Sequence, residues 1–163
     1  MISIAPAGEA DVPLILGFIR KLAEYEKLSH LVVATEANIR EHVFGPQAVA
    51  EVLLASWNGE VAGFALYFRN FSTFLGCPGI YLEDLFVDPE HRGKGLGKAL
   101  LIRLAQIAVE RGYGRLEWAV LDWNTPSIEF YRSLGAVPLD EWTAYRLTGE
   151  ALSRLALSHG RGA

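Results

Sequence analysis

Residues 81–98 read YLEDLFVDPEHRGKGLGK, and this stretch is the part of the sequence that decides the fold. Its first part continues the mostly apolar run that begins at Ile80 and ends at Asp88-Pro89, which is the pattern of a buried strand. A glycine-rich turn follows, and from about Gly95 to Arg111 apolar residues recur at helical spacing. The stretch therefore predicts a strand, a glycine-rich turn and a long amphipathic helix.

The flanking sequence supplies the other elements of the predicted fold. Asn58-Gly59 is a strong two-residue hairpin signal between two apolar runs, and Thr35 is placed to cap a short helix. We expect strands at residues 2–4, 52–57, 61–68, 80–87, 116–121 and 144–147, and helices at residues 12–25, 36–44, 95–111, 126–134 and 149–157. This order predicts a single α/β (α+β) domain over residues 1–163, with a mixed, mostly antiparallel sheet and helices on both faces.

Composition and charge exclude several classes of protein. Of the 163 residues 51% are hydrophobic, yet no apolar stretch approaches the roughly twenty residues of a membrane-spanning helix. The formal net charge of −4 lacks the basic surface that nucleic-acid binding needs. The N-terminus has no basic region ahead of an apolar core, and Cys77 has no partner for a disulfide. We therefore expect no secretory signal, no membrane or nucleic-acid partner, and a cytoplasmic location.

The histidines give no indication of a metal site. His30, His42 and His159 do not have the spacing of metal ligands, and a cysteine-rich zinc site is excluded because there is one cysteine. His91, which flanks the glycine-rich turn, is expected at the protein surface. We therefore expect no bound metal.

The glycine-rich turn has the features of an anion site. Glycines let backbone amides converge without side chains in the way, and the start of the following helix adds unpaired N–H groups and a partial positive charge. Such a site suits a pyrophosphate, and Arg92 and Lys94 add positive charge around it. The spacing does not fit an ATP-binding P-loop, because Gly93 lies one residue too close to Gly97-Lys98 and Ala99 replaces the metal-binding hydroxyl.

Two motifs together resemble one known family. The pattern R-x-x-G-x-G at Arg92, Gly95 and Gly97 resembles the acyl-CoA-binding loop of the GCN5-related N-acetyltransferases. Residues 122–136, DWNTPSIEFYRSLGA, resemble that family's second signature, N-x-x-[SA]-x-x-[FY]-Y-x-x-x-G. The similarity covers nearly the whole chain. Within this family the chain resembles the diamine (spermidine/spermine) acetyltransferase branch most, through Tyr25-Glu26 and the Tyr-Leu-Glu-Asp segment at residues 81–84.

The resemblance implies acetyl-CoA as the co-substrate. The residues expected to bind it are Leu85, Phe86, Val87, Arg92, Gly93, Lys94, Gly95, Leu96, Gly97, Lys98, Asn124, Ser127 and Tyr131. The polyamine enzymes of this branch carry an acidic residue and a tryptophan in the loop before the Tyr-Leu-Glu-Asp strand, where this chain has Ser72-Thr73-Phe74. We therefore expect a short primary amine to be accepted at least as well as spermine.

Acetyl transfer to an amine needs a group that takes a proton from the ammonium and a group that protonates the departing sulfur. The resemblance gives the second role to Tyr131. A carboxylate in an otherwise apolar strand is costly unless it is paired or functional, so Glu83 is the candidate base or amine-binding residue, acting through water. Strand alternation places Asp84 on the opposite face, as a structural or a substrate-binding carboxylate. The resemblance places Tyr25 and Glu26 at the end of the substrate cleft that binds the amine.

Three functions fit these residues. The main hypothesis is an enzyme that moves an acetyl group to a primary amine of a small molecule, of diamine, polyamine or lysine-analogue size, by direct attack in a ternary complex. The alternatives are a protein N-terminal or lysine acetyltransferase, and a non-catalytic acetyl-CoA-binding regulatory module. Glu83 and Tyr131 favour an enzyme, since a pure binder needs neither. Members of the family that this chain resembles pair as homodimers, and Trp142 and Leu147 are candidates for such an interface.

Overall fold

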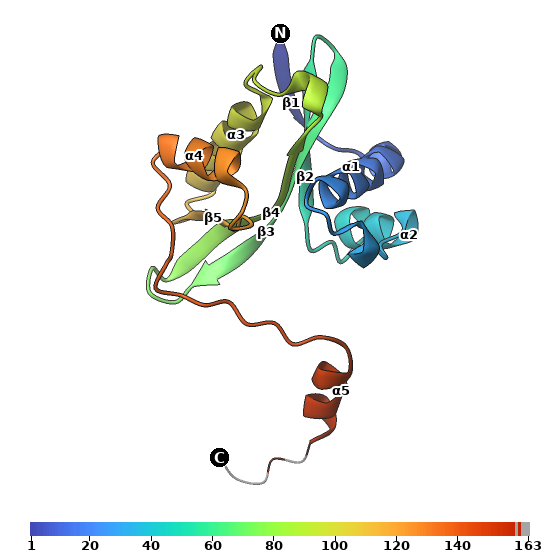
Figure 1. Ribbon diagram of the computed structural model, residues 1–163, viewed down its shortest axis with the longest axis vertical. Coiled ribbons are helices and arrows are strands. Elements are labelled where there is room, and N and C mark those ends of the chain that lie inside the picture. Colours follow the sequence, from blue (N-terminus) through green and yellow to red (C-terminus); the bar gives the residue numbers. More distant parts are fainter. Residues whose placement is uncertain (159, 161–163) are drawn as a thin grey trace. The chain divides into compact units, whose positions relative to one another are not determined.

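The predicted strand, turn and helix around residues 81–98 are present. The computed structural model describes residues 1–158 and 160, and in it β4 (Cys77–Val87) leads through a 3₁₀ turn at Pro89–His91 into α3 (Leu96–Glu110), as Figure 1 shows. Gly95 stands at the start of α3 with a left-handed φ of 93°, which a glycine adopts without steric cost. The sequence prediction of this segment is confirmed.

The elements before β4 also follow their local signals. The chain runs from β1 (Ile2–Pro6) through α1 (Val12–Tyr25) to α2 (Glu36–Ile39), which Thr35 caps by accepting a hydrogen bond from the Asn38 N–H at 3.2 Å. Strands β2 (Glu51–Trp57) and β3 (Glu60–Ser72) form a hairpin. At its turn Asn58 and Gly59 have φ of 50° and 90°, as the two-residue hairpin prediction requires.

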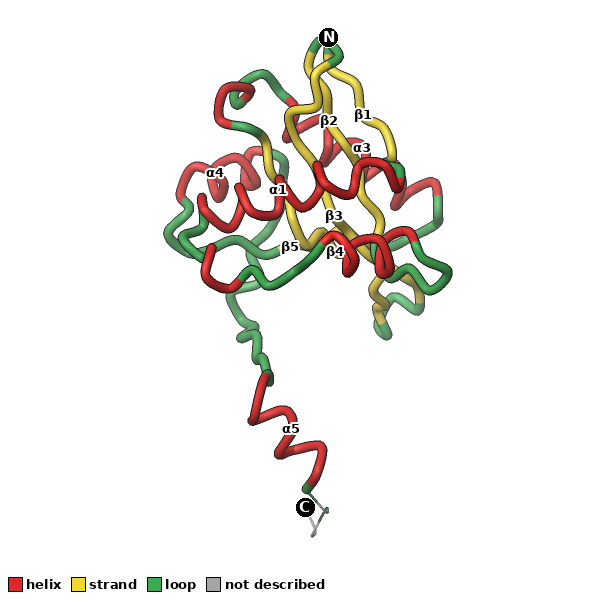
Figure 2. Tube along the Cα trace, turned by 90° about the vertical axis from the view of Figure 1, so that its right-hand side faces the viewer, coloured by secondary structure: helices red, strands yellow, loops and turns green. Residues whose placement is uncertain are grey.

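The five strands form one mixed sheet in the order β1-β2-β3-β4-β5. Neighbours pair antiparallel from β1 to β4, and β5 (Leu116–Trp118) pairs parallel with β4 because α3 carries the chain back between them. Helices α1 and α2 lie on one face and α3 on the other (Figures 1 and 2). The core on the α1 side includes Phe18, whose ring stacks on that of Phe64 at 5.4 Å. The predicted fold class is confirmed.

A β-bulge interrupts β4 at Glu83. In the β3–β4 ladder Asp84 lies opposite Leu66 while Leu82 lies opposite Tyr67, so Glu83 is an extra residue without an opposite partner. Strand alternation predicts that Leu82, Asp84 and Phe86 share a face; this holds for Asp84 and Phe86 and is wrong for Leu82. Because residues opposite each other share a face, Asp84 faces the same side as Leu66, which packs on the α1 core, whereas Leu82 faces the other side with Tyr67.

An ion pair fastens the end of α3 to the sheet. Arg111, just after α3, donates two hydrogen bonds of 2.8 Å to the carboxylate of Glu51 on β2. The Tyr67 hydroxyl lies 3.4 Å from the same carboxylate, and burial together with the charge of Glu51 raises the pKa of Tyr67 to about 12. These contacts hold the far end of the helix that begins at the glycine-rich loop.

The chain divides into two compact units, Met1–Leu121 and Asp122–Ala163. The second unit contains α4 (Thr125–Ser133) and α5 (Gly149–Leu157), whose bounds agree within one residue with the two helices predicted there. Residues 144–147, predicted as a strand, pair with no other strand among the described residues, so this prediction is wrong for the single chain. An isolated strand has no partner for its backbone hydrogen bonds and is not stable alone. His159 lies outside the described residues. Within those residues, no helix is long and apolar enough to cross a bilayer.

Candidate active site

Among the residues that the structure describes, one edge of β4 has no neighbouring strand at the residues expected to bind the acyl arm of acetyl-CoA. The pairing of β5 with β4 involves Ile80, Tyr81 and Leu82 and ends there. Within the described residues, β4 therefore runs from Glu83 to Val87 with β3 as its one neighbouring strand. Its backbone N–H and C=O groups on the other edge are available to a ligand. This edge includes the residues Leu85, Phe86 and Val87, which are predicted to bind acetyl-CoA.

The glycine-rich loop next to this edge has the geometry of a phosphate site. Gly93 and Gly95 both have left-handed φ, of 76° and 93°, so their amides turn into the loop. No side chain caps α3 at Gly95, and the first hydrogen bond inside the helix runs from the Ala99 N–H to the Gly95 carbonyl at 2.9 Å. The amides of residues 96–98 consequently have no partner inside the helix, and the loop fits a pyrophosphate.

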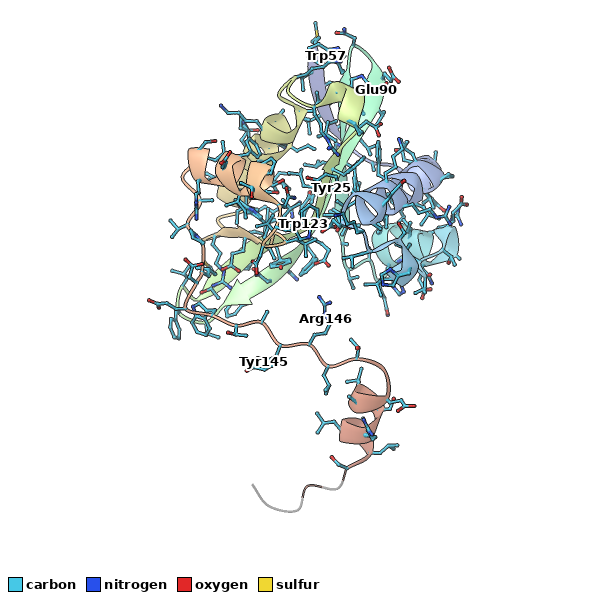
Figure 3. All side chains as sticks on the ribbon, in the orientation of Figure 1. Tyr25, Trp57, Glu90, Trp123, Tyr145 and Arg146 are labelled. Carbon is cyan, nitrogen blue, oxygen red and sulfur yellow. The ribbon has the colours of Figure 1, made fainter. Side chains whose placement is uncertain are left out.

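The two cations predicted beside this loop contact aromatic rings. The Lys94 ammonium lies 5.3 Å from the centre of the Trp57 ring, and Figure 3 shows Trp57 and Glu90 near the end of the sheet that carries the N-terminus. The Arg92 guanidinium lies 4.7 Å over the Tyr25 ring. Both are cation–π contacts, which fix the direction of each side chain.

Two of the carboxylates predicted for the amine site, Glu26 and Glu83, act on the third, Asp84. Glu26 follows the end of α1 half-buried, and burial raises its pKa. Burial, and then the negative charges of Glu83 and Glu26, raise the pKa of Asp84 to about 7. The structure therefore brings Glu26, Glu83 and Asp84 into one electrostatic neighbourhood, with Glu83 the exposed member.

This cluster changes the relative importance of Glu83 and Asp84. A carboxyl group with a pKa near 7 exists in both protonation states at neutral pH, which is the property a general base or acid needs. The strand pattern contains no reason to prefer Asp84, because neither its burial nor the bulge at Glu83, which separates the faces of Leu82 and Asp84, is visible in it.

His91 is another position where the prediction is wrong. The sequence predicts it at the surface, but it is 9% exposed, since the 3₁₀ turn at Pro89–His91 folds its side chain inward. Its Nδ1 atom has no hydrogen-bond partner among the described residues. His91 helps to line a pocket of about 600 Å³ between α1 and the turn after β4; the other lining residues are Lys21, Glu24, Tyr25, Glu60, Phe86, Asp88, Pro89, Glu90 and Arg92.

The loop predicted to influence specificity lies far along the strand. Ser72 pairs with Cys77 at the tip of the β3–β4 hairpin, and Phe74 in the tip is fully exposed. Cys77 and Glu83 are separated by about 20 Å of extended strand. Within one chain, a short amine held at Glu83 therefore does not reach Phe74.

The second unit holds the remaining predicted residues. Asn124 is buried and caps α4, since its Oδ1 accepts a hydrogen bond from the Ser127 N–H at 3.4 Å. Tyr131 lies on the same helix, with its ring 5.6 Å from that of Phe130. The family motif around Asn124 thus has a structural role inside this unit, which is to start the helix that carries Tyr131.

Comparison with known proteins gives a consistent result. Residues 19–136 match the model of the acetyltransferase (GNAT) family. Thialysine N-epsilon-acetyltransferase of Bos taurus is 41% identical, over 95% of this chain and 97% of that protein. L-ornithine N5-acetyltransferase of Arabidopsis thaliana is 34% identical, over 91% of this chain and 85% of that protein.

Solved structures share the fold. An integron cassette protein from the mobile metagenome of V. cholerae superposes with a TM-score of 0.80 at 30% identity, covering 96% of this chain and 98% of that one. A metagenomic aminoglycoside acetyltransferase superposes with a TM-score of 0.76 over 91% of this chain and 97% of its own, at 19% identity. The second similarity concerns the fold alone.

Proposed function

The chain belongs to the acetyltransferase (GNAT) family and is an N-acetyltransferase, and from this premise we propose that its acceptor is the terminal amine of a short molecule of lysine-analogue or diamine size. The observation that carries the proposal is the carboxylate cluster of Glu26, Glu83 and Asp84 beside the open edge of β4. Two similar enzymes are named for side-chain amines of this size, those of thialysine and ornithine, which supports the same acceptor class.

The cluster serves the acceptor in two ways. Its negative charge attracts an alkylammonium, whose pKa of about 10 keeps it protonated in water. A protonated amine has no lone pair, so the proton must leave before the nitrogen attacks. Asp84, with its pKa raised to about 7, and Glu83, directly or through water, are the proposed acceptors of that proton.

Acetyl-CoA is the co-substrate of this family, and the residues present fit it. Its pyrophosphate would lie on the amides of Gly93 to Lys98, and its acyl arm along the backbone of residues 85–87. An N–H group of that backbone would polarise the thioester carbonyl. The amine nitrogen then attacks the thioester carbon, so that the C–N bond forms and the C–S bond breaks. Tyr131 is the proposed donor of a proton to the sulfur, and the second proton that the nitrogen loses restores this hydroxyl through solvent.

A thiol-release assay with acetyl-CoA tests the acceptor. The acceptors are thialysine, ornithine, a short diamine, spermine and a lysine-containing peptide. We expect the short amines to give the highest kcat/KM, because the carboxylates that attract an ammonium lie together around Asp84. The residues at positions 72–74, about 20 Å along the strand, carry no charge for a second, distant ammonium. A value for spermine or for the peptide far above every short amine contradicts the proposal.

Three charge-removing variants test the cluster. Asp84→Asn and Glu83→Gln should lower kcat more than Glu26→Gln, because only the first two are proposed to take the proton. Glu36→Gln, an exposed carboxylate at the start of α2, is the control and should leave kcat unchanged. If Asp84→Asn and Glu83→Gln both keep the kcat and the pH profile of the wild type, the proton acceptor is not in this cluster.

We also propose that the enzyme is a homodimer. The C-terminal unit carries large apolar side chains with much of their surface exposed, among them Trp142 (77%) and Tyr145 (95%); Figure 3 labels Tyr145 together with Arg146. The residues predicted as a strand there, 144–147, have an alternating pattern that suits pairing with a second chain. Light scattering at micromolar concentration should give twice the mass of one chain, and the mass of a single chain would contradict the proposal.

A further inference from the structure

Arg92 opens the loop that fits a pyrophosphate, but its side chain is directed back toward α1. Its Nε donates a hydrogen bond of 3.0 Å to the carbonyl of Val87, the last residue of β4. Its guanidinium carbon lies 4.7 Å from the centre of the Tyr25 ring and 5.6 Å from that of Phe86. Figure 3 places Tyr25 between α1 and the sheet. One donor and the plane of the guanidinium are therefore already used inside the protein.

A second contact joins the same turn to the same helix. The Lys21 ammonium lies 2.7 Å from the Asp88 carboxylate. Lys21 and Tyr25 are four residues apart on α1 and so share one face of it, while Asp88 and Arg92 flank the 3₁₀ turn Pro89–His91. We call the two contacts, Lys21–Asp88 and Tyr25–Arg92, the α1 clamp.

The turn between the two halves of the clamp is itself held firmly. The Asp88 N–H donates to the Ala62 carbonyl of β3 at 2.8 Å, and the His91 N–H donates to the Asp88 carbonyl at 2.9 Å. The His91 side chain is buried beneath the turn. The turn is therefore fixed to β3, and the α1 clamp joins it to the helix.

Arg92 and Tyr25 are each adjacent in the sequence to a residue of one of the two proposed substrate sites. Gly93, the residue after Arg92, is the first of the loop whose amides fit a pyrophosphate. Glu26, the residue after Tyr25, is the half-buried carboxylate whose charge acts on Asp84. The contact between Arg92 and Tyr25 thus connects the loop to the carboxylate cluster.

We propose that Arg92 is a positioning residue that acts through Tyr25, so that the loop holding acetyl-CoA sets the position of the carboxylates that receive the amine. The proposal rests on the proposed function, since it takes the loop as the site of acetyl-CoA and the cluster as the site of the amine. It differs from the role that a phosphate-loop arginine has by default, which is direct contact with the ligand's phosphates.

The experiment compares Arg92→Gln, Arg92→Lys, Tyr25→Leu and the double variant Arg92→Gln/Tyr25→Leu. Arg103→Gln is the matched control, since Arg103 lies on the surface of α3 and pairs with Glu110. For each protein the dissociation constant of CoA is measured by calorimetry, and the KM and kcat for thialysine are measured at saturating acetyl-CoA. Thermal melting confirms that each variant is folded.

A positioning role predicts a specific pattern. Arg92→Gln should raise the KM for thialysine about tenfold while the CoA dissociation constant stays within about threefold, and the double variant should be no worse than the worse single one. Arg92→Lys should not restore the KM, because lysine keeps the charge but lacks the planar group and the Nε donor. Tyr25→Phe, which keeps the ring that the Arg92 guanidinium contacts, should raise the KM for thialysine less than Tyr25→Leu does.

Other patterns overturn the proposal. A CoA dissociation constant raised about tenfold with an unchanged amine KM assigns Arg92 to the phosphates instead. Additive effects of Arg92→Gln and Tyr25→Leu, on KM or on the free energy of unfolding in urea, show that the two residues do not act through each other. Failure of the proposed function looks different, because then the wild type itself binds no CoA or acetylates no short amine.

Discussion

Replacing Asp84 by asparagine should make the protein more stable, by an amount that grows with pH. Burial and the neighbouring charges of Glu83 and Glu26 raise the pKa of Asp84 from its ordinary value of 3.8 to about 7 in the folded state. Well below pH 3.8 the carboxyl is protonated whether the chain is folded or not, so it carries no penalty. As the pH rises from there through 7, the unfolded chain loses its proton first, and the folded state loses stability relative to it.

The size of the effect follows from the shift. A difference of about three pKa units corresponds to about 4 kcal/mol at pH values above 7, of which about 2.5 kcal/mol develops between about pH 5 and pH 8. Asparagine has nearly the same shape and does not titrate. The difference in unfolding free energy between Asp84→Asn and the wild type should therefore increase by about 2.5 kcal/mol over this range.

Urea unfolding followed by circular dichroism at several pH values measures this difference, and titrating groups that do not act on Asp84 cancel in the comparison. Glu36→Gln, which removes an exposed carboxylate, should give a curve parallel to that of the wild type. If the Asp84→Asn curve is also parallel to the wild type across this pH range, the carboxyl of Asp84 does not titrate near neutrality. Its role as the proton acceptor would then be wrong.

Three further outcomes are expected. Gly95→Val should abolish the rise in melting temperature that acetyl-CoA causes, because the left-handed φ of 93° is strained for valine and the side chain obstructs the amides of the loop. Tyr131→Phe should lower kcat by roughly 10²–10⁴-fold with little change in acetyl-CoA affinity, and an enzyme within about twofold of the wild type would remove this hydroxyl from the mechanism. Glu51→Gln breaks the ion pair between Glu51 and Arg111. Both side chains of this pair are more than one-third exposed, so the free energy of unfolding should fall by about 1 kcal/mol or less, seen as a lower urea midpoint with an unchanged slope.

Much of the fold could be predicted because its signals are local. The turn at Asn58-Gly59, the cap at Thr35 and the start of α3 at Gly95 each depend on residues within a few positions of one another. The open loop of amides follows from the same few glycines. The strand β4 and its helix α3 could be expected from apolar periodicity, and their order along the chain determined the parallel pairing with β5.

The carboxylate site could be predicted only in part. The sequence indicates Glu26, Glu83 and Asp84 as separate candidates, through a family resemblance and an unusual charge in an apolar strand. That Glu26 and Glu83 act on Asp84 depends on the tertiary structure, in which a bulge at Glu83 follows from how β3 pairs with β4. The pairing partners are distant in the sequence, so the bulge leaves no local pattern in the strand.

Burial and side-chain direction were decided by the tertiary structure alone. The sequence predicts His91 at the surface, whereas the fold buries it beneath the turn. The contact of Arg92 with the Tyr25 ring joins two residues that are distant in the sequence. Residues 144–147 have the pattern of a strand but pair with none in the described part of the chain. A periodic pattern determines which face of a segment is apolar. Which surface, helix or strand that face meets depends on residues distant in the sequence, and only the folded chain brings them together.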